Sequence, residues 1–566
     1  MTDQLARLRR QRTGPLILEL DLTEGITEEP PADPVSAVLT MRRSRLADVL
    51  DGLRRARNDR RVKALVAKVG GRPIGLATVQ EIRRAVEEFR DAGKLTVAWA
   101  ETFGEFSAGN VPYYLATAFE TIYLQPSGDL GLTGIAMERI FLRGTLDQLG
   151  IDFQVAKRHE YKSAAEQLTE RSFSAPAREA TERMAESITG QLTDAIAERR
   201  RLGTGRVREL IDQGPFLAAQ AHEHGLVDEL GYRDEVYARV RKHAGADAIT
   251  VHVGRYQRSR ALGERVRKLP TPTPQHVALV YATGPIRRGR SGRGPLSGGA
   301  MGSDTISAAL RAATADDGAR AIVLRVNSPG GSYVASDTIW REVVRARNSG
   351  KPVVVSMGDV AASGGYFISM AADAIVAQPG TVTGSIGVLS GKPVFSELLG
   401  RAGVTTDSVA EGAHSEMFKP TRPWNEEEWA LVNGWLDHIY EDFTGKVAAG
   451  RRMPADRVHE LARGRVWTGA DALANGLVDE LGGLDRAAAI ARRRAGLAAS
   501  APLRIYPRTG PLDRLRSSGS ADARPAAMLP GSALLAEAWG PVWRLASQAG
   551  LSPYGPLTLQ GSWVFE

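Results

Sequence analysis

The sequence repeats itself over roughly 230 residues, and this repeat constrains the fold more than any other feature. Residues 64–69 (Ala-Leu-Val-Ala-Lys-Val) match residues 321–326 (Ala-Ile-Val-Leu-Arg-Val) at an offset of 257. The string Gly-Leu-Val-Asp-Glu-Leu-Gly occurs at 225–231 and again at 476–482, at an offset of 251. Because the matching segments keep their order and almost keep their spacing, gene duplication is the economical explanation, and we expect two similar domains.

Each repeat alternates short β-branched runs with helical patterns. Residues 321–326 and 352–356 are typical of buried strands, and residues 336–348 carry the apolar period of a helix. Such alternation predicts mainly parallel sheets covered by helices. The predicted fold class is therefore α/β, with two tandem α/β domains that arose by internal duplication.

The repeat also predicts the domain boundaries, with an N-terminal repeat at 13–256 and a C-terminal repeat at 276–506. Residues 257–275 between them are rich in arginine and contain the run Pro-Thr-Pro-Thr-Pro, which disfavours both helix and sheet, so we expect an interdomain linker there. Residues 507–566 begin with a stretch rich in Ser, Gly, Pro and Arg and continue into an apolar segment, which predicts a flexible or apolar tail.

Composition narrows the possible chemistry. The chain has no cysteine, which excludes disulfides, thiolate metal sites and a cysteine nucleophile. Its 73 basic and 65 acidic residues are interspersed, so the net charge of +8 gives little support for nucleic-acid binding, and we expect none. No metal-binding or nucleotide-binding motif is present, so we expect neither a metal nor a cofactor.

The N-terminus carries no visible targeting segment. Its best apolar run, residues 15–22, is interrupted by Glu19 and Asp21, and no stretch reaches the roughly 20 apolar residues that cross a bilayer. We therefore expect no signal peptide and no transmembrane span, and at most a peripheral contact with the cell membrane, on a side that the sequence leaves open.

Two turns follow predicted strands and contain small residues. Gly330 and Gly331 can expose backbone N–H groups toward an anion, although a Gly-Gly turn is often only structural. Ser363 lies among small residues where a strand gives way to a helix, and the N–H of Gly364 can point the same way as the first two glycines. These residues are candidates for a nucleophile and its oxyanion hole. The alternative is a close contact between helix and sheet.

A nucleophilic serine needs a base. None of the nine histidines has a recognisable catalytic context. A lysine can serve if it is neutral, but at its usual pKa of about 10.4 only roughly one in a few thousand is neutral at pH 7. Burial or a nearby cation must therefore lower the pKa of any lysine base.

Four well-separated blocks together resemble the signature of the signal peptide peptidase A family, peptidase family S49. The blocks are residues 161–164, 327–332, 361–366 and 383–387. The resemblance spans nearly the whole chain and implies a ClpP/crotonase-like fold, with Ser363 as nucleophile, Lys162 as general base and Ser385 orienting the lysine. It also implies an acyl-enzyme mechanism, peptide substrates such as signal peptides and unfolded segments, and a homotetramer.

The duplication gives an independent check on this site. The offset places Asn110 opposite Ser363 and Ser415 opposite Lys162, so each repeat keeps one member of the pair. One composite site per chain is the natural interpretation. The linker holds the two repeats of one chain at high effective concentration, which favours a pair formed within a chain over one formed between chains.

Three other functions remain open at this stage. A crotonase-like enzyme would bind an acyl-CoA and need no nucleophile. A Clp-like protease would need a histidine after the Ser363 helix, and residues 375–387 contain none. A non-catalytic scaffold at the membrane would need neither a nucleophile nor a catalytic histidine.

Overall fold

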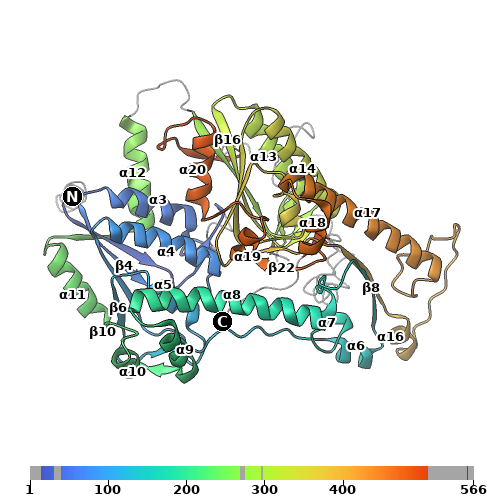
Figure 1. The fold of residues 1–566 in the computed structure, drawn as a ribbon, viewed down its shortest axis with the longest axis horizontal. Coiled ribbons are helices and arrows are strands. Elements are labelled where there is room, and N and C mark those ends of the chain that lie inside the picture. The colour runs from blue at the N-terminus through green and yellow to red at the C-terminus, as the bar shows by residue number, and fades with distance from the viewer. Residues whose placement is uncertain are drawn as a thin grey trace. The chain divides into compact units, whose positions relative to one another are not determined.

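The computed structural model describes residues 14–30, 38, 40–267, 275–294, 298–507 and 557–558 (Figure 1). These residues form two compact units. The first unit holds the described residues up to Met137 and those from Ala185 to 267, and the second holds Glu138–Met184 and the described residues from 275 onward. Each unit is built around a largely parallel sheet with helices, which confirms the predicted α/β class.

The first unit contains a parallel sheet of six strands in the order β10-β6-β5-β4-β1-β11. Its elements are β1 (Leu16–Asp21), β2 (Ile26–Thr27), β3 (Ser44–Arg45), α3 (Leu46–Arg57), β4 (Val62–Lys68), α4 (Leu76–Asp91), β5 (Leu95–Ala100), α5 (Asn110–Ala116), β6 (Thr121–Leu124), β7 (Asp129–Leu130), α9 (Thr204–Gln213), β9 (Phe216–Leu217), α10 (Ala218–Glu223), β10 (Glu229–Leu230), α11 (Arg233–Ala244), β11 (Ile249–His252) and α12 (Val253–Arg267).

Both faces of this sheet are covered by helices. Ile17 and Val66 belong to a buried cluster with Val236 and Val240 of α11. Because successive strand residues point to opposite faces, Leu18 and Leu65 face the other way, and both are fully buried. Helices α3, α4 and α12 pack there against one another and the strands. Double-sided burial explains why the strands are continuous apolar runs.

The second unit contains a sheet whose main order is β22-β20-β18-β16-β12-β24, parallel except for β20 with β22. Its elements are α6 (Arg143–Leu149), β8 (Asp152–Lys157), α7 (Glu166–Thr169), β12 (His276–Thr283), β13 (Ile286–Arg287), β14 (Gly292–Gly294), β15 (Gly298–Gly302), α13 (Ser303–Ala315), β16 (Ala319–Ser328), β17 (Gly330–Gly331), α14 (Tyr333–Asn348), β18 (Val353–Ala362), α15 (Gly364–Phe367), β19 (Ala374–Ala377), β20 (Val382–Gly384), β21 (Leu389–Val394), α16 (Ser396–Arg401), α17 (Glu426–Arg451), α18 (Ala455–Leu461), β22 (Val466–Thr468), α19 (Gly469–Ala474), β23 (Glu480–Leu481), α20 (Leu484–Arg494), β24 (Leu503–Tyr506) and β25 (Leu557–Thr558). Helix α8 (Ala175–Arg200) begins in this unit and continues into the first.

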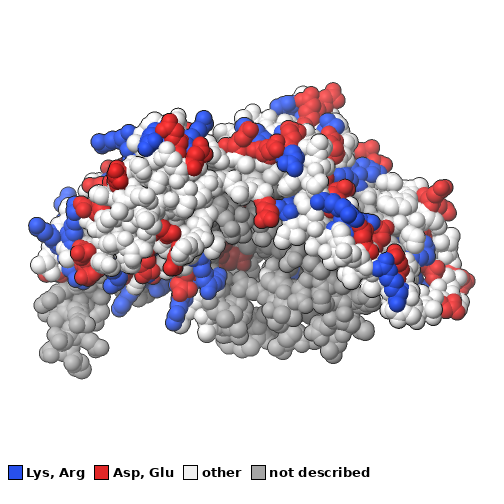
Figure 2. All heavy atoms as spheres, turned by 90° about the horizontal axis from the view of Figure 1, so that it is seen from below, with Lys and Arg blue, Asp and Glu red and all other residues white. Residues whose placement is uncertain are grey.

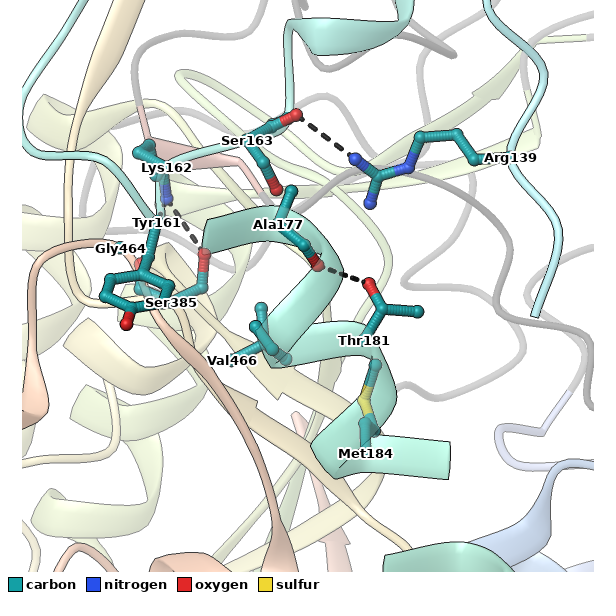
Figure 3. A pocket seen from close by; sticks show the side chains of 12 residues that line it. Arg139, Tyr161, Lys162, Ser163, Ala177, Thr181, Met184, Ser385, Gly464 and Val466 are labelled. Atoms are coloured by element: carbon teal, nitrogen blue, oxygen red, sulfur yellow. Dashed lines mark hydrogen bonds between the residues drawn. The ribbon is translucent and has the colours of Figure 1, made fainter. Parts of the chain in front are cut away.

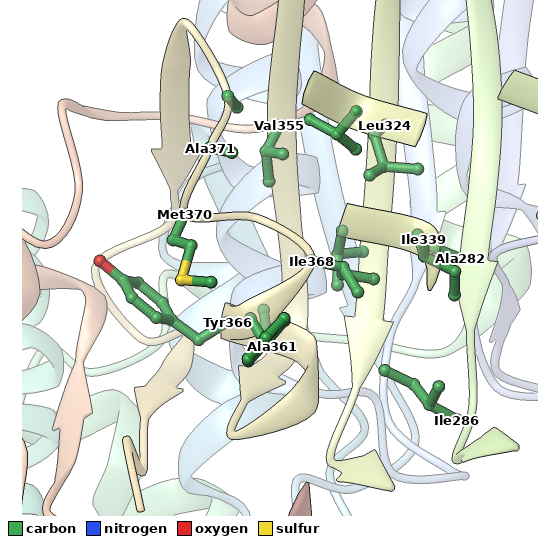
Figure 4. Packing of buried hydrophobic residues seen from close by; sticks show 14 of the residues in the cluster. Ala282, Ile286, Leu324, Ile339, Val355, Ala361, Tyr366, Ile368, Met370 and Ala371 are labelled. Carbon is green, nitrogen blue, oxygen red and sulfur yellow. The ribbon is translucent and has the colours of Figure 1, made fainter. Parts of the chain in front are cut away.

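The core of the second unit lies between its central strands and α14. Leu324 of β16, Val355 of β18 and Ile339 of α14 belong to one hydrophobic cluster, and all three side chains are fully buried (Figure 4). Burial of each such side chain stabilises the fold by about 1.5–3 kcal/mol through the hydrophobic effect. The strands and the helix expected at 321–326, 352–356 and 336–348 are therefore confirmed.

The segment that carries Lys162 joins the second unit, although the sequence assigns it to the first repeat. Strand β8 pairs with β21 in antiparallel register from Asp152↔Val394 to Lys157↔Leu389. The compact units therefore do not follow the repeat boundaries, because this separate two-stranded ladder and the helices beside it attach Glu138–Met184 to the second unit.

The expected linker is partly helical. Helix α12 extends to Arg267, since proline enters the sequence only at residue 270 and cannot interrupt the helix before then. The remainder of that linker, 268–274, lies outside the described residues, as does the expected tail 507–566 apart from Pro507 and β25.

Charge is mixed over the surface. On the face drawn in Figure 2, basic and acidic side chains of the described residues lie interspersed. Within the described part of the chain, no helix is both long enough and apolar enough to cross a membrane.

Candidate active site

The three residues expected to act together meet inside the second unit. The Nζ atom of Lys162 lies 2.9 Å from Oγ of Ser363 and 3.0 Å from both Oγ and the carbonyl oxygen of Ser385. The residues are 1%, 0% and 2% exposed, respectively. Lys162 and Ser363 belong to the same chain, 201 residues apart. The structure thus forms a closed, buried lysine–serine contact.

Ser363 occupies a sharp turn between β18 and α15. Its φ of 54° and ψ of −114° are rare for a residue with a side chain, and such conformations persist only where the surroundings enforce them. Two backbone hydrogen bonds do so here: Ser363 N–H donates to the carbonyl of Gly384 at 2.8 Å, and Phe367 N–H donates to the carbonyl of Ser363 at 2.8 Å. The strained turn fixes the Oγ direction at the end of the strand.

Burial changes the acidity of Lys162. Its ammonium loses hydration in this site, which lowers the pKa of Lys162 from 10.5 to about 7. No carboxylate of the described residues forms an ion pair with it that would restore the charged form. Near neutral pH a large fraction of Lys162 is therefore a free amine.

The hydrogen bonds orient that amine. A carbonyl oxygen can only accept, so one N–H of Lys162 points to the Ser385 carbonyl. A second N–H can point to Ser385 Oγ. This leaves the nitrogen lone pair for the hydroxyl hydrogen of Ser363, which is the arrangement that a general base requires.

The predicted oxyanion glycines also lie together. A Cβ added to Gly364 would lie 3.0 Å from Cα of Gly330 and 3.1 Å from the nitrogen of Gly331, so only glycine fits this approach. Gly364 is the first residue of α15, where N–H groups lack acceptors within the helix. Gly330 N–H is engaged with Ser328 Oγ at 3.2 Å. The N–H of Gly364 is therefore the better placed donor.

The sequence did not reveal a turn at residues 462–465 that closes over Lys162. Gly464 has a φ of +86°, and a Cβ there would lie 2.4 Å from the backbone nitrogen of Lys162. The next residue, Arg465, accepts a hydrogen bond from Ser385 N–H at its carbonyl, at 2.7 Å. The turn at 462–465 thus covers Lys162 and also holds Ser385 in place. No local pattern signals this, because the contacts join residues 302 positions apart (Gly464 and Lys162) and 80 positions apart (Arg465 and Ser385).

The four residues before Lys162 are all tied to α17, α18 or the 462–465 turn. These contacts are Arg158 with Asp437 and Asn433, the His159 ring tilted against the Tyr440 ring, Glu160 paired with Arg463, and the Tyr161 ring beneath the guanidinium of Arg465. These contacts fix the position of residues 158–161, and this position places the Lys162 side chain in the buried site.

Replacing Gly464 by alanine is expected to lower kcat/KM for peptide hydrolysis by about 100-fold, because the new methyl group displaces the Lys162 backbone and a displacement near 1 Å has effects of this size. Gly496→Ala is the matched control, since its φ of +63° carries a similar backbone penalty but no atom lies within 4 Å of its added Cβ. Equal kinetic losses in the two variants would show that strain, and not contact with Lys162, is responsible.

The corresponding position in the first unit is filled differently. Asn110 begins α5, and its side chain accepts from the N–H groups of Thr133 and Gly134 at 3.1 Å and donates to the carbonyl of Gly134 at 2.8 Å. The amide oxygen and one amide N–H are thus held in structural bonds. Ser415, opposite Lys162 in the repeat, is exposed.

Other catalytic groups are lacking near Ser363 among the residues that the structure describes. All nine histidines are described, and none forms a hydrogen bond with Ser363. No group of three or more His, Asp or Glu side chains in this part of the chain could hold a metal ion.

Comparison with known proteins finds similarity to two protease families. The profile of Peptidase family S49 matches residues 88–247 and 345–498, one segment in each repeat. The profile of Clp protease matches residues 300–380. Among solved structures, a mutant of ClpP1 from Listeria monocytogenes aligns with a TM-score of 0.23 at 16% identity, over 36% of this chain and 91% of that one.

Three relatives illustrate the similarity. The chain is 33% identical to the chloroplastic serine protease SPPA of Arabidopsis thaliana, over 78% of this chain and 64% of that one, which is less than two thirds of its length. It is 33% identical to Protease 4 of Salmonella typhi, over 80% of this chain and 72% of that one. It is 38% identical to a putative signal peptide peptidase SppA of Enterococcus faecium, over 30% of this chain and 48% of that one. The chain therefore belongs to peptidase family S49 and is a serine protease of that family.

Proposed function

We propose that this protein is an endopeptidase that hydrolyses hydrophobic or unfolded peptides, such as cleaved signal peptides, through a Ser363/Lys162 dyad. The observation that carries the proposal is the 2.9 Å contact between Lys162 Nζ and Ser363 Oγ in a site buried enough to bring the pKa of the lysine to about 7. The signal-peptide substrate class is supported by the sequence resemblance and by the similarity to the putative signal peptide peptidase SppA of Enterococcus faecium.

In the acylation step, Ser363 Oγ attacks the carbonyl carbon of the scissile bond while neutral Lys162 takes the hydroxyl proton. Negative charge then develops on the carbonyl oxygen, near the N–H group of Gly364 beside the Gly330–Gly331 turn. The ammonium of Lys162 returns its proton to the leaving amine, and the amine departs to leave an acyl-enzyme. Water attacks this ester with Lys162 again as base, which releases the acid and restores both residues.

Ser385 serves as a positioning residue in this scheme. Its carbonyl and hydroxyl oxygens hold two N–H groups of Lys162 and thereby aim the lone pair. Its own backbone has a φ of 50° and donates to Arg465, so the turn is fixed from both sides.

Strand β17 offers a place for the peptide. In the structure β25 pairs with β17 in antiparallel direction, with Thr558 opposite Gly330 and Leu557 opposite Gly331. An extended segment therefore fits beside the glycines next to Ser363. A substrate that adds as a strand in this way would present its carbonyl groups to the same turn.

Labelling with a fluorophosphonate, which reacts with activated serines, tests the dyad. We expect the wild-type protein to be labelled on Ser363 at pH 8, and Ser363→Ala and Lys162→Met not to be labelled. Ser349→Ala is a control that should be labelled like the wild-type protein, because the Ser349 hydroxyl only donates to the Ala346 carbonyl at the C-terminal end of α14. A non-catalytic scaffold or an acyl-CoA enzyme without a nucleophile would leave all four proteins unlabelled.

The assembly and location belong to the same proposal. The family resemblance supports a homotetramer, and the basic N-terminal sequence supports a peripheral membrane contact. Light scattering of the full chain and flotation with anionic vesicles test these two points. A monomer, or a chain that stays with the soluble fraction, would contradict them.

A further inference from the structure

A small pocket of about 20 Å³ opens beside Lys162, on the side of α8 (Figure 3). Lys162 and Ser385 form part of its wall, so it adjoins the reacting atoms. The rest of the lining is mostly small, with Ala164, Ala177 and Ala180 among it. The space has room for about one water molecule, so a peptide held at Ser363 could place only the tip of one group in it, of about the size of a carboxylate.

One charged side chain also lines the pocket. Arg139 lies at its edge, and Figure 3 shows the guanidinium directed toward Ser163 and the space beside Ala177. Its contacts with the described residues are a hydrogen bond from Nη1 to the Ser163 carbonyl at 3.4 Å and a stacking contact 5.2 Å from the Phe173 ring. Most of its five N–H donors are therefore left for another acceptor.

No described carboxylate forms an ion pair with Arg139. Glu166 is the nearest candidate, because its charge raises the pKa of Arg139 against the larger, lowering effect of burial. However, Glu166 is already engaged by Lys157 at 3.3 Å and by the Ser174 hydroxyl at 2.7 Å. A half-buried guanidinium without a counterion has lost part of its hydration, and nothing offsets this cost. An incoming carboxylate would offset it with charge-assisted hydrogen bonds.

We propose that the pocket is a substrate subsite in which Arg139 binds a carboxylate of the peptide. The carboxylate can be an acidic side chain or the free C-terminus of a peptide that ends in small residues, and both fit small walls with one cation at the edge. The inference rests on the proposed function, because it takes Ser363 and Lys162 as the point at which the peptide is cleaved. It assigns a charge preference that the hydrophobic substrate class alone does not predict.

Equilibrium binding to the full-length Ser363→Ala protein tests this subsite without any turnover. The probes are labelled heptapeptides of alanine and leucine, measured by fluorescence anisotropy. One arm compares Glu with Gln at each position in C-terminally amidated peptides, and the other compares a free C-terminal carboxylate with its amide. We expect about tenfold tighter binding of the acidic member in one arm, as a charge-assisted pair provides.

The added substitution Arg139→Gln should abolish that difference, and Arg139→Lys should retain part of it, since the charge remains but the planar fork is lost. Arg178→Gln is the matched control: Arg178 also lies over Phe173, at 5.7 Å, but it does not line the pocket. Equal binding in both arms, or a preference that survives Arg139→Gln, would overturn the subsite. If Ser363 were not the nucleophile, the Ser363→Ala protein would still hydrolyse peptides. The binding experiment does not depend on hydrolysis, so the two failures can be told apart.

Discussion

Lys162→Met is expected to reduce kcat for peptide hydrolysis by about 10⁴-fold or more, as does Ser363→Ala, because removing either member of a catalytic unit disables the whole. Methionine retains the length and apolar stem of lysine and removes only the amine. The double variant should be no slower than either single variant, since the two residues act in one step. Steady-state kinetics on a fluorogenic peptide measures this. A folded Lys162→Met protein with wild-type turnover would eliminate lysine as the base.

The same variant separates catalysis from stability. Because burial lowers the pKa of Lys162 to about 7, the unfolded chain binds one more proton than the folded chain between pH 7 and 10.5. Lys162 therefore makes the wild-type free energy of unfolding rise with pH across this window, by up to about 1.4 kcal/mol per pH unit. Lys162→Met should lack this rise. Denaturant titrations at several pH values compare the two slopes, and parallel slopes would argue against a depressed lysine pKa.

The pH dependence of kcat/KM is the second large effect. Only the neutral amine can accept the Ser363 proton, so activity should increase as pH rises through about 7 and reach a plateau above it. At pH 5 we expect about 100-fold lower kcat/KM than on the plateau, since roughly 1% of the lysine is then neutral. A profile recorded from pH 5 to 9 measures the midpoint.

His159 provides the control for this profile, because it lies three residues before Lys162 and is the neighbouring group that could titrate in the same range. His159→Phe keeps the ring contact with Tyr440 and should leave the midpoint unchanged. A midpoint that moves with this substitution would assign the ionisation to the histidine. A flat profile with rate-limiting chemistry would contradict a lysine base altogether.

Much of the fold was predictable because its signals are local. The strands at 321–326 and 352–356 are buried on both faces, so their sequences are continuous apolar runs that any window reveals. The turn of Gly330 and Gly331 and the small residues around Ser363 are likewise local, since close backbone approach requires glycine within a few positions. The linker was less predictable: Arg258 to Arg267 joins a helix because only the later prolines exclude one.

The sequence by itself determined two α/β repeats and located the glycine-rich turns around Ser363, because periodicity and glycine geometry are properties of neighbouring residues; the role of Ser363 as nucleophile came from the resemblance. It also indicated Lys162 through resemblance, but its charged neighbours Arg158, His159 and Glu160 are typical of an exposed surface. Only the tertiary structure decided that this lysine is buried, because β8 pairs with β21 and Gly464 closes over it from far along the chain. Desolvation depends on everything that surrounds an atom, so the lowered pKa of Lys162, on which its proposed role as a base depends, cannot be a property of its local sequence.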